Sequence, residues 1–181
     1  MKASSVQLSI LPGNALLDAY RRSGAFTDCY WVAAPYKVSL ARYAEAFYTT
    51  WLFKLERWII GWAVNLPSSD VEAKQLATGS LTRFAAWTVE ARTETQLLLC
   101  DINARTRSWL MVEHVDAGSH CGTVLYFGSA VVPIAAAKTG ERLPGWRFKA
   151  LLGFHRIYSR ALLAAARKRL LATQDAQPLH P

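Results

Sequence analysis

Four polar side chains have the sequence spacing to meet in one small-molecule site. Arg107 and Cys100 are expected to be cross-strand neighbours in a β-hairpin, and His155 and Tyr158 fall on the apolar stripe of a predicted C-terminal helix. A buried arginine or histidine needs a partner, because an unpaired charge away from water is costly. Convergent polar groups in an apolar setting orient the ligand in many small-molecule pockets. We therefore expect a ligand site where the hairpin faces the helix.

Three aromatic residues of the same sheet complete the predicted site. The predicted ligand-binding residues are Trp87, Cys100, Arg107, Trp109, Tyr126, His155 and Tyr158. Two simpler roles stay open, in which Arg107 extends from a strand end into water and His155 bonds a backbone carbonyl group. A carboxylate on the ligand would offset the cost of burying Arg107, so ligands bearing an anionic group are expected to bind best.

A second polar group lies at the predicted end of a hairpin. It comprises Glu113, His114, Asp116, His120 and Cys121. The expected turn places His114 opposite Cys121, but Glu113 and His120 would point to the other face. Zinc requires convergent ligands at ~2.0–2.3 Å, which this arrangement does not provide. We expect an exposed polar hairpin end, no metal and no cofactor.

The elements that must position these residues follow from hydrophobic periodicity. Aromatic and β-branched residues predict a strand over 26–34, and apolar residues at helical spacing predict a long helix over 40–62. Ser69 and Glu72 form a capping-box pattern that begins a short helix ending at Gly79. An antiparallel meander of four strands follows over 80–133, and the last long helix is expected over residues 146–171.

Alternation along the meander sorts its side chains onto two faces. We expect the first face to lie under the last helix and to include Trp87, Val89, Gln96, Leu98, Cys100, Ile102, Arg107, Trp109, Met111, Glu113, Val124 and Tyr126. The other face collects more polar residues among Leu97, Leu99, Leu110, Val112, Leu125 and Phe127. A one-residue slip would exchange the two faces.

Length and composition are those of a single globular domain. The 181 residues are 52% hydrophobic and 19% charged, which excludes disordered and low-complexity classes. We expect an irregular leader over 1–25, one domain over 26–172 and a frayed tail over 173–181. No apolar run approaches the ~20 residues of a membrane-spanning helix. The apolar patch over 6–11 is too short and interrupted for a signal-peptide core, so a cytoplasmic location is expected. Three cysteines without a CxxC pair indicate reduced thiols.

Positive charge is concentrated near the C-terminus. The segment 138–172 holds nine basic residues and one acid, so its net charge of +8 equals that of the whole chain. A solvated cationic face on an amphipathic helix explains this simply. An anionic membrane, nucleic acid or acidic protein as a partner is the alternative.

The order of strand, long helix, short helix, meander and long helix resembles the helix-grip fold of START domains, polyketide cyclases and pollen-allergen-type proteins. Three segments are similar to an uncharacterised bacterial protein family related to that superfamily: AFYTTWLFKLERWIIGWA, RFAAWTVEARTETQLLLCDINARTRSWLMVE and GWRFKALLGFHRIYSRALL. The resemblance implies an α+β fold in which an antiparallel sheet of about five strands wraps around a long C-terminal helix. The four strands predicted between the helices are fewer than the six usual in that fold.

These expectations favour a cofactor-free protein that binds a small apolar or aromatic molecule between its sheet and last helix. One alternative is a peripheral interaction protein that uses its basic C-terminal helix. Another is a cyclase- or hydrolase-like enzyme with Arg107, His155 and Tyr158 in acid–base roles. No sequence feature selects among enzymatic steps or sets an oligomeric state.

Overall fold

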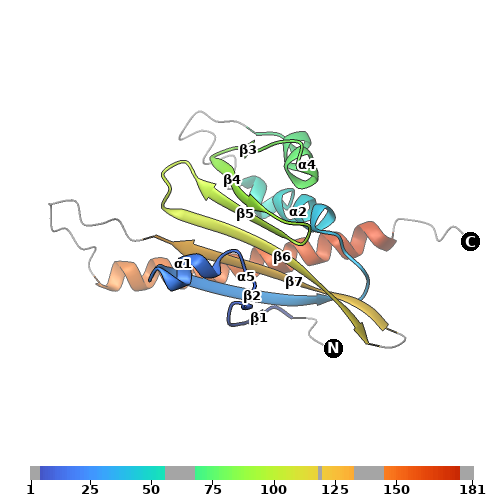
Figure 1. Cartoon of the computed structure of the whole chain (residues 1–181), viewed down its shortest axis with the longest axis horizontal. Coiled ribbons are helices and arrows are strands. Elements are labelled where there is room, and N and C mark those ends of the chain that lie inside the picture. The colour runs from blue at the N-terminus through green and yellow to red at the C-terminus, as the bar shows by residue number, and fades with distance from the viewer. Residues whose placement is uncertain (1–4, 56–67, 118–119, 133–144, 176–181) are drawn as a thin grey trace, which may run out of the picture.

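The chain folds as an α+β structure around one open antiparallel sheet (Figure 1). A computed structural model describes residues 5–55, 68–117, 120–132 and 145–175. The sheet has seven strands in the order β1-β2-β7-β6-β5-β4-β3. The strands are β1 (Gln7–Leu8), β2 (Phe26–Ala34), β3 (Arg83–Phe84), β4 (Trp87–Arg92), β5 (Gln96–Asp101), β6 (Thr106–Ala117) and β7 (His120–Val131), and the helices are α1 (Asp18–Arg22), α2 (Leu40–Tyr48), α4 (Asp70–Thr78) and α5 (Gly145–Asp175).

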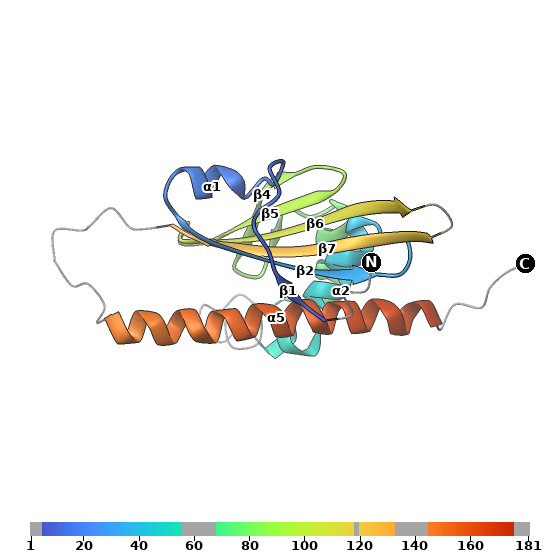
Figure 2. The ribbon, with the colours of Figure 1, turned by 90° about the horizontal axis from the view of Figure 1, so that it is seen from below.

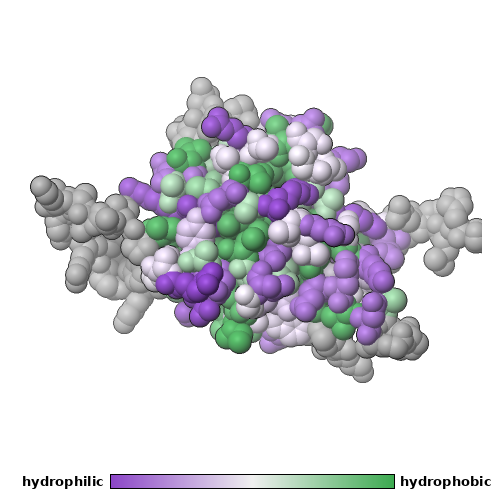
Figure 3. Space-filling model, viewed as in Figure 1, coloured by the Kyte–Doolittle hydropathy of each residue, from purple (hydrophilic) through white to green (hydrophobic). Residues whose placement is uncertain are grey.

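The sheet is the middle of three layers. Figure 2 shows α5 and α2 on one side and α1 on the other. The larger core cluster joins the sheet to α2, α4 and α5, and the smaller one lies under α1. From the α1 side, hydrophilic residues cover much of the surface, with smaller hydrophobic groups between them (Figure 3). Both sheet faces are therefore at least partly covered.

Several predicted elements are confirmed. β2 has the predicted bounds, and β4 to β7 form the four-stranded meander. The Ser69–Glu72 capping box begins α4, and Gly79 ends it in the left-handed conformation with a φ of 84°. The strand count exceeds the predicted five because β1 and β3 each have two residues. Such short strands give no periodic signal.

The helix predicted over 40–62 is interrupted at Thr49 and Thr50, just after α2. Each threonine hydroxyl donates to a carbonyl oxygen three or four residues earlier, at 2.6 Å from Thr49 and 2.9 Å from Thr50. Thr50 also accepts from the backbone N–H of Phe53 at 3.2 Å, at the start of the helical segment 51–55. These side-chain bonds compete with a continuous helix. The rest of the predicted helix lies outside the described residues.

The last helix covers the sheet face opposite to the predicted one. Leu97, Leu110 and Phe127 belong to the core cluster that includes α5. Trp109 and Tyr126 belong to the cluster next to α1. The order of the four strands and the pairing of β5 with β6 were predicted correctly, but the choice of the inner face was wrong.

The error arises because both sheet faces are apolar and both are covered. Polar residues on the α5 side are satisfied inside the protein, so they do not mark a solvent face. Thr123, for example, donates to the carbonyl oxygen of Tyr36 at 2.8 Å and accepts from the N–H of Val38 at 3.0 Å. Alternation of apolar and polar residues therefore gives the pairing but not the direction of burial.

A β-bulge at Glu90 moves the start of β4 to the other face. β4 pairs Val89 with Leu99 but Ala91 with Leu98, which leaves Glu90 as the extra residue. Trp87 and Val89 consequently pack against the α5-side core. Trp87 thus lies on the predicted side of the sheet, away from the other aromatic residues assigned to its face.

Candidate functional site

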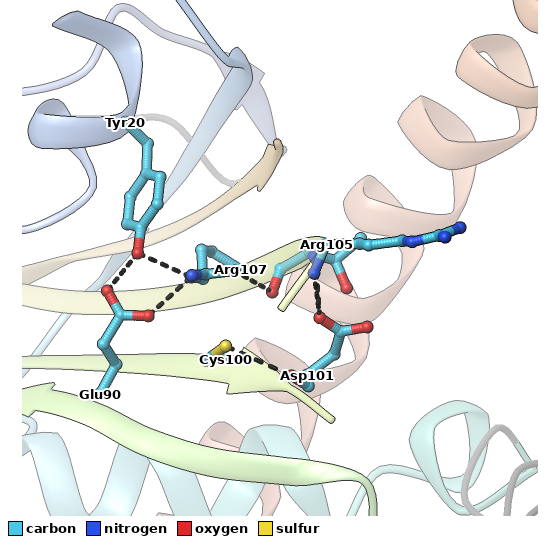
Figure 4. Close-up of polar contacts among 7 residues, drawn as sticks. Tyr20, Glu90, Cys100, Asp101, Arg105 and Arg107 are labelled. Carbon is cyan, nitrogen blue, oxygen red and sulfur yellow. Dashed lines mark hydrogen bonds and ion pairs between the residues drawn. The ribbon is translucent and has the colours of Figure 1, made fainter. Parts of the chain in front are cut away.

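Arg107 lies on the α1 side of the sheet, where its charge is already paired. Its Nε donates to Glu90 Oε2 at 2.6 Å and to Tyr20 Oη at 2.8 Å (Figure 4). Tyr20 in turn donates to Glu90, and its ring centroid lies 4.6 Å from the Arg107 guanidinium carbon. α1, β4 and β6 each supply one member, and Arg107 is only 9% exposed. These contacts join α1 to the sheet.

Electrostatics in this cluster favour an ion pair over reactive chemistry. Burial acts to lower the pKa of Arg107, but the hydrogen bond that Arg107 donates to Tyr20 and the charge of Glu90 outweigh it and raise that pKa. Burial raises the pKa of the neighbouring Cys100 thiol, against the opposing effect of Arg107. A protonated thiol is a poor nucleophile. The cluster is therefore suited to holding α1 rather than to binding an anion or to catalysis.

Gln96 fixes the leader segment just before α1. Its Oε1 accepts from Trp109 Nε1 at 2.9 Å and from the backbone N–H of Leu16 at 2.8 Å. Its Nε2 donates to the carbonyl oxygen of Asn14 at 2.9 Å. The leader, expected to be irregular, thus contains β1 and α1 and closes one face of the sheet. Trp109 serves this contact and is fully buried.

On the α5 side, His155 meets polar residues of β2 and β7. Its Nε2 lies 2.7 Å from Ser129 Oγ and 3.3 Å from Asp28 Oδ2. Ser129 donates its hydroxyl at 2.6 Å and its backbone N–H at 3.0 Å to Asp28 Oδ1. Ser159 Oγ, one turn along α5, lies 3.5 Å from the same His155 nitrogen. We call Asp28, Tyr30, Ser129, His155 and Ser159 the Asp28 cluster.

The proton positions in the Asp28 cluster do not match a nucleophilic serine. Ser129 has one hydroxyl proton and gives it to Asp28 Oδ1, so His155 Nε2 must be the donor in its bond to Ser129 Oγ. Serine catalysis needs a histidine nitrogen that accepts the serine proton, with the carboxylate on the other ring nitrogen. Here serine and carboxylate meet the same nitrogen. The arrangement joins α5 to the sheet around a buried carboxylate.

The seven predicted ligand-binding residues divide between the two faces. Cys100 and Arg107 are cross-strand neighbours, as predicted, but both lie on the face away from His155. On the α1 side lie Cys100, Arg107, Trp109 and Tyr126, and on the α5 side lie Trp87, His155 and Tyr158. The seven therefore do not line one pocket. The predicted encounter of Arg107 with His155 is wrong, because the sheet separates them.

The sequence analysis did not identify the hydrogen-bond partners of Arg107 and His155. Asp28 was the available signal, since it is an acid inside the apolar strand over 26–34. A carboxylate at an inward position of such a strand requires a donor from another element. Glu90 and Tyr20 gave no comparable signal, because the bulge that turns Glu90 toward Arg107 is not visible in the alternation.

The polar hairpin end has a different register from the predicted one. His114 pairs with Thr123, and not with Cys121 as expected, and Asp116 pairs with Cys121. Asp116 lies 3.7 Å from Lys37 Nζ, and Cys121 is exposed. Within the part of the chain that the structure describes, no group of three or more His, Cys, Asp or Glu side chains is placed to hold a metal ion.

Comparisons with known proteins add no relative. The chain matches no protein-family model, no curated protein and no solved structure. In the described ranges, no helix is at once long enough and apolar enough to cross a membrane. Function is therefore inferred from the side chains and their geometry.

Proposed function

We propose that the protein is helix-grip-like and binds a small, largely apolar or aromatic molecule between its sheet and α5. Two features of the topology support the resemblance: the first long strand, β2, lies beside the last strand, β7, and the final helix packs across them. Five strands, β3 to β7, follow the two helices α2 and α4. The cavity-forming side in such a fold is the side of the last helix.

The observation that carries the binding proposal is a polar pair that runs from solvent into this interface. The His155 side chain is 31% exposed, whereas the side chain of its partner Asp28 is only 5% exposed. An apolar interface would be more stable with apolar residues of similar shape at both positions, because burying a carboxylate is costly. A polar pair open to water at one end suits a ligand with a polar group.

Apolar side chains of intermediate burial border the same core. They are Tyr36, Leu52, Trp87, Val89 and Tyr158. Two of these, Trp87 and Tyr158, were predicted ligand-binding residues. Their incomplete burial leaves apolar surface that a ligand would cover, at a gain of roughly 25 cal/mol per Å².

A thermal-shift screen of small apolar and aromatic compounds tests this function. Saturable stabilisation of the full chain is expected, because a ligand that binds only the folded state raises its melting temperature. His155→Leu should change the shift, whereas the matched control His114→Leu at the hairpin end should leave it unchanged. The proposal fails if no compound gives a saturable shift, or if both variants respond like the wild type.

The acid–base alternative loses its residue set. Arg107 is held by Glu90 and Tyr20 on the opposite sheet face from His155 and Tyr158. Three side chains separated by the sheet do not act on one substrate. The compartment proposal keeps its support, because the cysteines at 29, 100 and 121 are all free thiols, as in a reducing cytoplasm.

The basic outer face of α5 favours a second function, contact with an anionic surface. Arg156, Lys168 and Arg169 are exposed there, and Ile157 is 72% exposed beside them. A cationic helix face with an exposed apolar side chain suits a membrane carrying anionic lipids. Not all the charge is free for this purpose. The guanidiniums of residues 160 and 167 bond backbone carbonyl oxygens of β2 and the N-terminal segment.

Vesicle binding separates this second function from a merely solvated face. Anionic vesicles should bind the protein at low salt and release it at high salt. The triple change of Arg156, Lys168 and Arg169 to Gln should abolish binding, whereas changing the internally bonded Arg167→Gln should reduce it less. Vesicle binding that does not depend on salt, or that the triple variant retains, would exclude this role. Tighter binding of DNA than of vesicles would show that the anionic partner is a nucleic acid.

A further inference from the structure

Two buried oxygen atoms at the interface of the sheet with α5 lack a hydrogen-bond partner among the described residues. They are Asp28 Oδ2 and Tyr30 Oη, both on β2. Counted over the whole residue, Asp28 is 7% exposed and Tyr30 is 1% exposed. Buried polar atoms are nearly always satisfied, and leaving one unsatisfied is costly. Two such atoms, close to each other on one strand face, mark a point where a bound polar atom would gain hydrogen-bond partners.

The two oxygen atoms act on each other and on α5. Burial raises the pKa of Tyr30 to about 12, and the nearby Asp28 carboxylate adds to this rise both through its charge and as a hydrogen-bond acceptor. His155 Nε2 lies 3.3 Å from Asp28 Oδ2, and Ser159 is fully buried beside it. Polar groups from β2 and α5 thus converge on one point inside the apolar core. A water molecule or a ligand atom held there would have several polar neighbours, as buried water usually has.

The hydrogen-bond donors already in use around Asp28 define which chemical groups could bind there. Ser129 gives both its donors to Asp28 Oδ1, and the Nε2 proton of His155 goes to Ser129 Oγ. Asp28 Oδ2 lies near the Tyr30 hydroxyl, which carries a proton, and still has a lone pair for a further donor. A hydroxyl or an ammonium group would satisfy it, and a second carboxylate would be repelled. Arg156 and Arg160 lower the pKa of Tyr30 only secondarily, and both are solvent-exposed, so water screens their charges.

The surroundings of the point are apolar. Tyr30 pairs with Phe127 across the sheet, and both pack in the core cluster with Leu162 and Leu163 of α5. A ligand that placed a donor at Asp28 would lay its carbon skeleton among these side chains. The predicted preference for anionic ligands relied on Arg107, which lies on the other face. On the side of the sheet that α5 covers, the buried charge is the negative charge of Asp28.

We propose that Asp28 and Tyr30 form the polar end of the ligand site and recognise the hydroxyl or protonated amine of an otherwise apolar molecule. This inference rests on the proposed binding function and specifies its ligand class. It reverses the sign of the head group expected from the sequence. Asp28 supplies the charged acceptor, and the Tyr30 hydroxyl serves as donor or acceptor according to the ligand.

Three ligands with one carbon skeleton test the head-group preference. Octylammonium, 1-octanol and octanoate are titrated into the full chain at pH 7, with tryptophan fluorescence as the readout. Octylammonium and octanol should bind at least about tenfold more tightly than octanoate, a difference of ~1.4 kcal/mol. Equal affinities, or tighter binding of octanoate, would overturn the head-group inference but leave the binding function standing. If none of the three binds, the head-group inference falls, and the thermal-shift screen decides the binding function separately.

Matched variants assign the preference to the two residues. Asp28→Asn should remove the selectivity for octylammonium over octanoate, and Tyr30→Phe should weaken octanol binding. The controls are Tyr126→Phe on the opposite face and Asp116→Asn at the hairpin end, and both should keep wild-type selectivity. The affinity ratio is the decisive readout, because a general loss of stability would weaken all three ligands together. Selectivity retained in Asp28→Asn would refute the assignment, and the wild-type panel still decides if that variant does not fold.

Discussion

Gly128 of β7 shows how closely the layers approach one another at single residues. A Cβ at this position would lie 2.8 Å from the carbonyl oxygen of Asp28, and 3.0 Å from both Leu17 Cδ2 and Trp109 Cε3. The backbone of β2, the leader residue Leu17 and the buried Trp109 thus all pack against the position where a side chain at 128 would lie. The smallness of glycine, and not its conformational freedom, is what this position requires.

Gly128→Ala should destabilise the fold by about 1–3 kcal/mol, because a backbone oxygen and two buried side chains must move. The free energy of unfolding in urea measures the loss. Gly13→Ala is the control, since a Cβ there meets no atom within 4 Å. Equal stability of the two variants would mean that the approach of Leu17 and Trp109 is looser than described.

At the scale of elements, α1 has only five residues and owes its position to long-range contacts. A helix of this length has little stability of its own. Tyr20 reaches Glu90 and Arg107, and the leader is tied by Gln96. α1 should therefore detach when these contacts are removed, while the α5 side stays folded.

Arg107→Met tests this dependence. Loss of two bonds involving charged groups should cost about 1.5–3 kcal/mol and leave Glu90 without its cation. Hydrogen exchange should rise over residues 15–22 and much less over α4. Arg105→Met is the matched control, because the Arg105 side chain is exposed and should change stability by no more than about 0.5 kcal/mol. Unchanged exchange in α1 would mean that its apolar contacts alone hold it.

The elements were predictable where their causes are local, and the faces were not. Ser69, Glu72 and Gly79 sit within eleven residues of one another, so the ends of α4 are encoded beside it. The choice of the inner sheet face depends instead on α1, whose Tyr20 lies 70 residues from Glu90. The alternation of apolar and polar residues along the strands contains no information about whether a distant segment such as α1 covers one face of the sheet. The ligand site was misplaced for the same reason.

At the scale of the whole molecule, several weak acids are buried in protonated form. Burial raises the pKa of Cys29 to about 12 from 9.0 and that of Tyr30 to about 12 from 10.0. Burial also raises the pKa of Tyr43 and of Tyr126. The unfolded chain would release these protons at lower pH than the folded protein. Their contribution to stability is therefore complete below about pH 9 and is lost as the pH rises toward 12.

Unfolding free energy measured in urea from pH 7 to pH 11 should be insensitive to these groups up to about pH 9 and fall steeply above it. Cys29→Ala should make the fall shallower, since one of the shifted acids is removed. Cys121→Ala is the control, because Cys121 is exposed. Parallel curves for wild type and Cys29→Ala above pH 9 would show that the thiol stays protonated in both states.

The bond from Arg160 to the carbonyl oxygen of Val6 joins residues 154 positions apart, and Ser129 meets Asp28 across 101 positions. Proteins dominated by such distant contacts fold slowly, since long loops must close before the contacts form. During synthesis the apolar sheet face that α5 covers would stay open until that helix leaves the ribosome. Such exposed strands favour aggregation. Expression yield of this chain should therefore depend on chaperones more than its native stability alone would suggest.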